Sequence, residues 1–307
     1  MQQYHPQYNQ PRDRSLSPIP RPKDFTLDDN LPVLNPRVRR APVANLGALE
    51  SLPLELLQIV FTPLDLHSLS SFRRVNRRAL HMIEALPDYH AIKIYALSAL
   101  RGIAMLGLDS TITLSTLYQK LCTAKCEECG DFAGYLYLLT CKRVCFLCFS
   151  RNEKYLPLLK SHAVRKFGIT NKMINSLPHF KSVPGRYSTR GLKVAKPITL
   201  VDYESAYQAG LAHLGDSRLK SHMRHAAIHE DPTRDLGDSN PNRFMAISRT
   251  PWYNAVLEKV DPGFHCVGCE SMDNDRPFHW RVKYDDKLFN EHTRAFGKIR
   301  KGNHWPE

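Results

Sequence analysis

Motifs that mark the common catalytic sites are absent from this chain of 307 residues. It has no glycine-rich phosphate loop, no Gly-x-Ser-x-Gly nucleophile motif and no His-Glu-x-x-His zinc motif. It also lacks a convincing pair of carboxylates for acid–base chemistry and a Cys-x-x-Cys-His haem attachment. These absences exclude the enzyme and cytochrome classes that the motifs define. We therefore expect a protein without catalytic activity of its own.

Long apolar runs are also missing. The first six residues are polar and do not resemble the apolar part of a secretory signal. The most apolar long window, residues 91–108, is interrupted by Lys93 and Arg101 and is too charged to span a bilayer. We expect an intracellular protein, in the cytoplasm or the nucleus, that makes no membrane contact.

Acidic residues are scarce in residues 141–200, where Glu153 is the only one. With thirteen Lys or Arg, this basic block carries +12 of the net charge of +13. Such a block attracts nucleic acid or an acidic protein, or it offsets the negative charge of a nearby zinc–thiolate site. Its basic residues are Lys142, Arg143, Arg151, Lys154, Lys160, Arg165, Lys166, Lys172, Lys181, Arg186, Arg190, Lys193 and Lys196.

Prolines are concentrated near the beginning, where residues 1–45 hold eight of the twenty-one. This stretch also has few aromatic residues, so it cannot build a core, and we expect a disordered Pro-rich tail. The hydrophobic content of 42% over the whole chain is sufficient for the rest to fold.

Three short helices are predicted in residues 46–93. Pro53 suits the first position of a helix, and Asp65 and Asn76 suit the cap positions of the next two. A unit of this size buries little surface, so we expect part of its apolar set to serve an interface. The apolar positions are Leu52, Leu56, Ile59 and Val60 in the first helix, Leu66, Leu69, Phe72 and Val75 in the second, and Ala79, Met82, Ile83 and Leu86 in the third.

The order of these residues resembles an F-box. The match consists of Leu52-Pro53-x-Glu55-Leu56-Leu57-x-Ile59, Leu64-x-Leu66-x-x-Leu69 and Phe72-x-x-Val75-Asn76. The resemblance implies docking onto the Skp-type adaptor and the cullin scaffold of an SCF ubiquitin ligase. It implies that the core and the adaptor face are formed by Leu52, Pro53, Glu55, Leu56, Ile59, Leu64, Leu69, Phe72 and Val75. The alternative is an ordinary helical subdomain with Leu-Pro at a helix start.

Two Cys-x-x-Cys pairs, Cys126 with Cys129 and Cys145 with Cys148, are separated by fifteen residues. This spacing predicts a tetrahedral Zn²⁺ site, because one turn can present both sulfurs of a pair to a single ion. Four protein ligands leave no open position, so the zinc would be structural. Aromatic alternation between the pairs predicts a connecting strand or hairpin. Cys122 and Cys141 lie close enough in sequence to remain alternative ligands.

A third pair, Cys266 and Cys269, indicates a second candidate metal site that includes His292. The segment Phe289-x-x-His292 resembles a helix that in related proteins supplies a His and, four residues later, a Cys. Because position 296 is Phe, either His279 or His304 would have to complete the set. A redox pair is the alternative. His225 and His229 also have metal-binding spacing, but a basic solvated helix face is the better interpretation.

An F-box followed by cysteine knuckles is similar to a set of fungal F-box proteins with a cysteine-rich C-terminal region. We expect a mainly α fold with small β elements, in which a three-helix F-box precedes a zinc-stabilised α+β region. Helices are predicted over 91–107, 114–121, 152–167 and 288–296, and from a cap at Asp202 towards His229. The predicted parts are a disordered tail (1–45), an F-box (46–93), a helical spacer with the four-cysteine module (94–175) and a substrate-recognition region of undefined fold (176–307).

The expected function is that of the substrate-recognition subunit of an SCF-type ligase, which binds the adaptor through the F-box and an unknown target protein through the C-terminal region. One alternative is a zinc-dependent nucleic-acid-binding protein that uses residues 141–200. The other is an adaptor-bound scaffold that acts outside a ligase.

Overall fold

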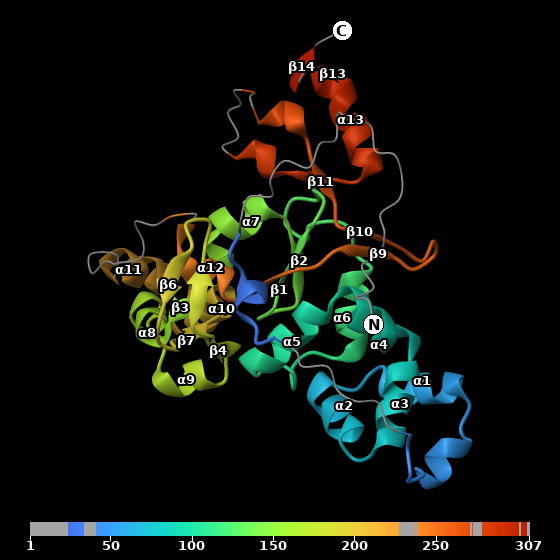
Figure 1. Ribbon diagram of the computed structural model, residues 1–307. Coiled ribbons are helices and arrows are strands. Elements are labelled where there is room, and N and C mark those ends of the chain that lie inside the picture. The colour runs from blue at the N-terminus through green and yellow to red at the C-terminus, as the bar shows by residue number, and fades with distance from the viewer. Residues whose placement is uncertain are drawn as a thin grey trace.

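The computed structural model describes residues 24–33, 41–226, 237, 239–270, 272, 278–300 and 302–305. Helices dominate and the sheets are small and antiparallel, so the predicted mainly α fold with small β elements is confirmed. Figure 1 shows the helices from α1 (Leu54–Phe61) to α3 (Arg77–Ala85) at lower right and a lobe from α8 (Lys160–Phe167) to α12 (Pro241–Phe244) at left. The C-terminal unit is at the top. None of the described helices has the length and apolar character that crossing a membrane requires.

The three helices predicted in residues 46–93 are present. Asp65 accepts a hydrogen bond from the Ser68 N–H at 2.8 Å, and Asn76 accepts one from the Ala79 N–H at 2.8 Å, as helix caps do. Pro53 lies one residue earlier than predicted, directly before the first helix. The helices are α1 (Leu54–Phe61), α2 (Leu66–Arg73) and α3 (Arg77–Ala85).

The next segment corrects one prediction. The helix predicted over 91–107 is two helices, which meet at Ala96, where φ is −130° and ψ is 30°. Ala96 is buried, so the change of direction lets both helices pack on the core. The helix predicted over 114–121 is confirmed, with Thr113 as its cap. The elements are α4 (Pro87–Tyr95), α5 (Leu97–Leu106) and α6 (Leu114–Leu121).

A three-stranded sheet lies at the centre of the molecule, with strand order β2-β1-β8. Leu136 of β1 faces Arg143 of β2 on one side and Ser248 of β8 on the other. One continuous set of buried residues extends from Leu27 to Val282 across the predicted boundaries at residues 93 and 175. The elements are β1 (Tyr135–Tyr137), β2 (Lys142–Val144), α7 (Phe146–Arg151) and β8 (Ile247–Arg249).

A second hydrophobic cluster fills the left lobe, around Phe167, Val201 and Leu219. The helix predicted over 152–167 is partly wrong, because it begins only at Lys160 and a short strand precedes it. Asp202 caps a helix as predicted, but Gly215 separates it from the next one. The elements are β3 (Leu158–Leu159), α8 (Lys160–Phe167), α9 (Asn171–Asn175), β4 (His179–Lys181), β5 (Gly185–Tyr187), β6 (Leu192–Val194), β7 (Thr199–Val201), α10 (Tyr203–Leu214), α11 (Asp216–Ala226) and α12 (Pro241–Phe244).

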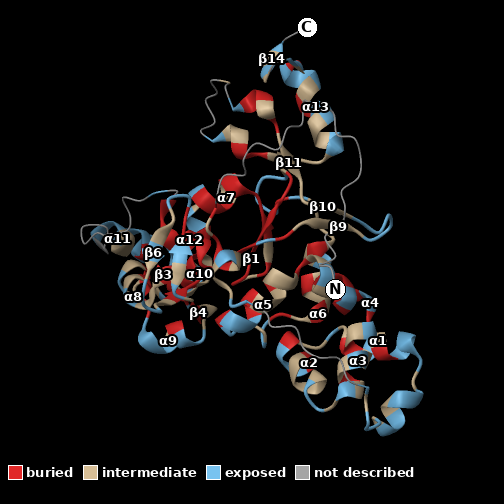
Figure 2. Ribbon diagram, viewed as in Figure 1, coloured by how far each residue is buried: buried red, intermediate tan, exposed pale blue. Residues whose placement is uncertain are grey.

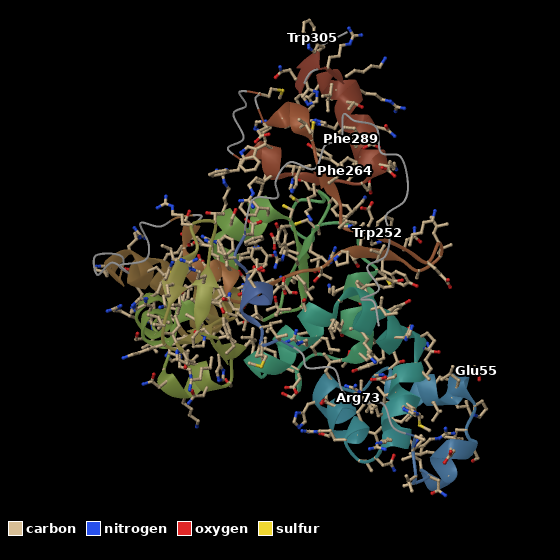
Figure 3. All side chains as sticks on the ribbon, in the orientation of Figure 1. Glu55, Arg73, Trp252, Phe264, Phe289 and Trp305 are labelled. Carbon is tan, nitrogen blue, oxygen red and sulfur yellow. The ribbon has the colours of Figure 1, made fainter. Side chains whose placement is uncertain are left out.

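The C-terminal part consists of small hairpins and one helix, the latter near the predicted 288–296. Figure 2 shows little buried ribbon in this unit compared with the central sheet. Its apolar packing includes Phe264 and Phe289, which lie beside one another with ring centres 5.1 Å apart (Figure 3). The elements are β9 (Trp252–Asn254), β10 (Lys259–Asp261), β11 (Phe264–His265), β12 (Lys283–Tyr284), α13 (Asp286–Phe296), β13 (Lys298–Arg300) and β14 (Asn303–Trp305).

Part of the predicted disordered tail is ordered, which is a second correction. A short 3₁₀ helix at Leu27–Asn30 packs between α5 and β8, and Leu27 is fully buried. Asp28 accepts hydrogen bonds from the Ser248 hydroxyl at 2.7 Å and the Arg249 N–H at 2.6 Å. This segment therefore packs on the core through Asp24, Thr26 and Leu27, whereas Pro32 and Val33 are exposed. Residues 1–23 and 34–40 lie outside the described part of the chain.

Candidate functional site

The four cysteines predicted as zinc ligands come together between α6 and α7. All four sulfurs of Cys126, Cys129, Cys145 and Cys148 lie within 4.8 Å of one another. The first pair is in the loop after α6, and the second straddles the start of α7, where Cys145 is the cap residue. This arrangement can hold one metal ion with four sulfur ligands.

Backbone geometry places these sulfurs. Gly130 has φ of +80°, which suits glycine, and its N–H donates to the Cys126 carbonyl at 2.9 Å to close the first turn. The Cys148 N–H donates to the Cys145 sulfur at 3.4 Å. Hydrogen bonds donated by the Cys145 and Cys148 thiols also lower the pKa of Cys126. The surroundings thus favour a thiolate at Cys126, the form that binds metal, whereas the pKa values of Cys129, Cys145 and Cys148 are raised.

The two alternative cysteines are not in this cluster. Burial raises the pKa of Cys141 to about 12, so its thiol stays protonated. Burial also raises the pKa of Cys122. Neither belongs to a group of metal-binding side chains among the described residues. The structure therefore supports the Cys-x-x-Cys pairs over either alternative.

A second cluster contains Cys266, Cys269, His292 and His304, again with all ligand atoms within 4.8 Å of one another. The Cys266 sulfur lies 3.2 Å from His304 Nε2, and the Cys269 sulfur lies 3.3 Å from His292 Nε2. The two Nε2 atoms are 3.1 Å apart. Four ligand atoms thus converge as in a Cys₂His₂ metal site.

The rings of both histidines are oriented by their other nitrogens. His304 Nδ1 lies 2.9 Å from the Gly297 carbonyl, an acceptor only, so Nδ1 carries the proton and the Nε2 lone pair faces the cluster. His292 Nδ1 lies 3.4 Å from the Tyr284 hydroxyl. A hydrogen bond from Cys269, with a further one from His292, lowers the pKa of Cys266 to about 4. A lowered thiol pKa is common to metal sites and redox pairs. The two histidines beside the cysteine pair favour a metal site, because they complete a set of four ligands.

The choice between His279 and His304 is settled by the β13–β14 hairpin, which carries His304 to the cluster. His279 lies elsewhere, and its Nε2 is buried without a hydrogen-bond partner among the described residues. Phe296 packs against the His292 ring, with ring centres 4.8 Å apart. The resemblance placed a cysteine ligand at this position, and an aromatic contact takes its place here. The other predicted metal-binding pair is His225 with His229, and His229 lies outside the described residues.

A buried ion pair joins the C-terminal unit to the N-terminal segment. Arg281, in the C-terminal unit, pairs with Asp24 of the N-terminal segment, and both side chains are about 95% buried. The Arg281 guanidinium lies 3.4 Å from the centre of the Phe146 ring, one residue after the ligand Cys145. Tyr135 donates to Asp24 at 2.7 Å. No sequence pattern indicated this contact, because 257 positions separate its partners.

The residues predicted for an adaptor face fall into three groups. Leu69 is buried, and Leu52, Leu64 and Phe72 are partly buried and pack on the core. The exposed members are Pro53, Glu55, Leu56, Ile59 and Val75. Figure 3 shows Glu55 on the outer side of α1, away from the central sheet.

The thirteen residues of the basic block also differ in burial. Arg143 is fully buried and donates to the Thr250 carbonyl at 2.9 Å and to the Ala133 carbonyl, so it is a core residue and not part of a surface. Lys142, Lys160 and Lys166 are half-buried. The nine exposed members are Arg151, Lys154, Arg165, Lys172, Lys181, Arg186, Arg190, Lys193 and Lys196.

Comparison with known proteins gives no match for this chain, whether to a protein-family model, a curated protein or a solved structure. Its function therefore has to be argued from the two Cys/His clusters, the exposed face of α1 and the basic surface.

Proposed function

We propose that this chain is the substrate-recognition subunit of an SCF-type ubiquitin ligase, with α1 docking onto a Skp-type adaptor. The observation that carries the proposal is the outward face of α1. Ile59 is 70% exposed and Leu56 is 46% exposed, although both are apolar. The inward residues Leu57 and Phe61 already anchor the helix to the core, so the outward ones are free for a partner.

Further apolar side chains of the same helical unit are exposed. Val60, next to Ile59 in α1, is 48% exposed, Leu54 at the start of α1 is 41% exposed, and Val75, two residues after α2, is 68% exposed. Burying one such side chain against a partner contributes about 1.5–3 kcal/mol. Several together would support specific binding after the costs of association are met. The F-box resemblance runs through this stretch, which is why we choose an adaptor as the partner.

We further propose that both Cys/His clusters hold structural Zn²⁺. Each supplies four protein ligands, which leaves no position for water or substrate. The C-terminal unit has few other buried contacts, because the buried apolar residues among those described between 264 and 305 are Cys266, Cys269 and Val282. Metal binding would therefore supply much of its folding free energy. The chain would promote ubiquitin transfer by proximity, with no acid, base or nucleophile of its own.

The nine exposed cations favour a second candidate function, binding of nucleic acid. A steep loss of affinity for generic DNA or RNA with increasing salt would support it, because binding releases counterions from the phosphates.

The adaptor proposal is tested with Leu56→Asp and Ile59→Asp combined, in a pull-down of purified chain with the Skp-type adaptor. Because both side chains point outwards, the variant should fold and keep its zinc content but lose adaptor binding. The matched control is Val256→Asp with Leu257→Asp on the β9–β10 hairpin, where the side chains are 91% and 62% exposed.

Adaptor binding that survives in the α1 variant, or fails equally in both variants, would refute the proposal. Co-purification of the cullin with the wild-type chain separates a ligase subunit from an adaptor-bound scaffold.

A further inference from the structure

A group of cations surrounds the β5–β6 hairpin. Between residues 154 and 201 the chain contains no Asp or Glu. Within that stretch five exposed basic residues follow one another along β4, the hairpin and the segment after it. This basic hairpin surface consists of Lys181, Arg186, Arg190, Lys193 and Lys196.

None of these five side chains forms an ion pair with a described residue, in contrast to other cations of the same block. Lys154 lies 3.7 Å from a carboxylate oxygen of Glu128, and Lys166 lies 3.5 Å from one of Glu153. In those two pairs a neighbouring carboxylate offsets the charge of the lysine. On the basic hairpin surface the charge is left without such a partner in the described part of the chain.

The hairpin also places like charges directly opposite one another. Arg186 of β5 and Lys193 of β6 are paired in the strand register. Opposed like charges destabilise a two-stranded pair. The other side of the hairpin is apolar and packed inwards, since Tyr187 is fully buried and Val194 packs on the core. Stability alone therefore gives no reason for two cations at these positions.

The N-terminal segment holds the backbone of Arg186, one member of this pair of like charges. The Asn30 side chain donates to the Arg186 carbonyl at 2.8 Å and accepts from the Arg186 N–H at 2.8 Å. A side chain at Gly185 would overlap Asn30, so the approach depends on glycine there. The Asn30 side chain thus holds both the N–H and the carbonyl of Arg186 before any ligand arrives. Such preorganisation reduces the entropy lost on binding.

We propose that the basic hairpin surface binds an acidic, Asp- and Glu-rich segment of a partner protein. Arginine and lysine form charge-assisted hydrogen bonds with carboxylates, and an exposed hairpin face suits an extended segment. Nucleic acid fits less well, because single-stranded binding uses aromatic side chains as stacking platforms. The aromatic residues of β4 and β5, Phe180 and Tyr187, are both buried. Phe25, which packs beside Gly191 at the turn of the hairpin, is half-buried. The inference does not depend on adaptor binding, which uses the opposite end of the fold.

The test measures fluorescence anisotropy of a labelled peptide of alternating glutamate and glycine, with the full zinc-loaded chain. The variant is Arg186→Gln with Lys193→Gln. Its matched control is Lys154→Gln with Lys166→Gln, which removes the same charge from paired positions. We expect the hairpin variant to weaken binding about tenfold, and the control to change it less than about twofold.

A second measurement guards against misfolding. Because the substitution removes opposed like charges, the thermal midpoint of the hairpin variant should equal or exceed that of the wild type. Adaptor pull-down should be unchanged, so failure here is distinguishable from failure of the ligase proposal.

Three outcomes would overturn the inference. The peptide fails to bind the wild-type chain, or both double variants weaken binding equally, which would indicate net charge alone. In the third, a single-stranded oligonucleotide of similar length binds more tightly than the peptide and is sensitive to the hairpin variant, which would assign the surface to nucleic acid.

Discussion

The buried ion pair between Asp24 and Arg281 allows a quantitative prediction about how the C-terminal unit is attached. We consider Asp24→Asn, Arg281→Met and the double variant. Arg281→Met keeps a long side chain on the Phe146 ring but leaves the Asp24 carboxylate buried without its cation. The hydrogen bond from the Tyr135 hydroxyl remains, but it does not neutralise the charge. Removal of one member of a buried pair costs about 3–5 kcal/mol.

Each single variant should therefore lower the free energy of unfolding by about 3 kcal/mol or more. The double variant should lose less than the sum of the two by about 2 kcal/mol. The reason is that it removes both charges, whereas each single variant leaves one buried charge without its partner. This coupling separates a true ion pair from two independent packing contacts.

The assay is denaturant unfolding at saturating zinc, followed by tryptophan fluorescence. Trp280 adjoins Arg281, whose guanidinium lies 5.4 Å from its ring centre, so its emission reports release of the C-terminal unit. Additive losses, or single-variant losses below about 1 kcal/mol, would refute the reasoning, because they fall in the range of exposed pairs.

Two further predictions concern the metal centres and a helix cap. Elemental analysis should find two zinc ions per wild-type chain and one in either Cys129→Ser or His304→Ala, whereas Cys122→Ser should keep two; unchanged zinc in the first two variants would contradict the assigned ligands. Asp65→Ala should lower the free energy of unfolding by about 1 kcal/mol, because it removes the α2 cap. The hydrogen bond from the Ser68 N–H lowers the pKa of Asp65. The cap should therefore stabilise fully above the unfolded pKa of about 3.9, and the difference between wild type and variant should vanish as pH falls through the lower folded value. A difference that persists in strong acid would show that the carboxylate is not responsible.

Features decided by neighbouring residues could be predicted from the sequence. The caps at Asp65, Asn76 and Asp202 were correct, because a cap needs only a short polar side chain and the N–H groups that follow it. The predicted grouping of Cys126, Cys129, Cys145 and Cys148 was also correct, since each Cys-x-x-Cys pair is presented by one local turn. Zinc binding at this cluster stays a prediction.

Features decided by distant packing could not be predicted. Nothing in the sequence marks Ala96 as a break, because it is an ordinary helix former and the turn there serves the core. His304 remained one of two options, since the β13–β14 hairpin decides which histidine reaches the cluster. The burial of Arg143 could not be predicted from the sequence. One of its acceptors, the Thr250 carbonyl, is a backbone group 107 positions away.

The segment at residues 24–33 has a consequence for how the molecule is assembled. During synthesis this segment is made well before its partners Arg249 and Arg281, which are 221 and 257 positions later than Asp28 and Asp24. Closing such long loops is slow because much chain entropy is lost before any contact forms. The contacts of this segment with β8 and Arg281 thus cannot form until the chain has been made beyond those residues. Until then Leu27 does not occupy its position beside Gly102. The nascent protein therefore exposes apolar surface that is buried in the folded protein.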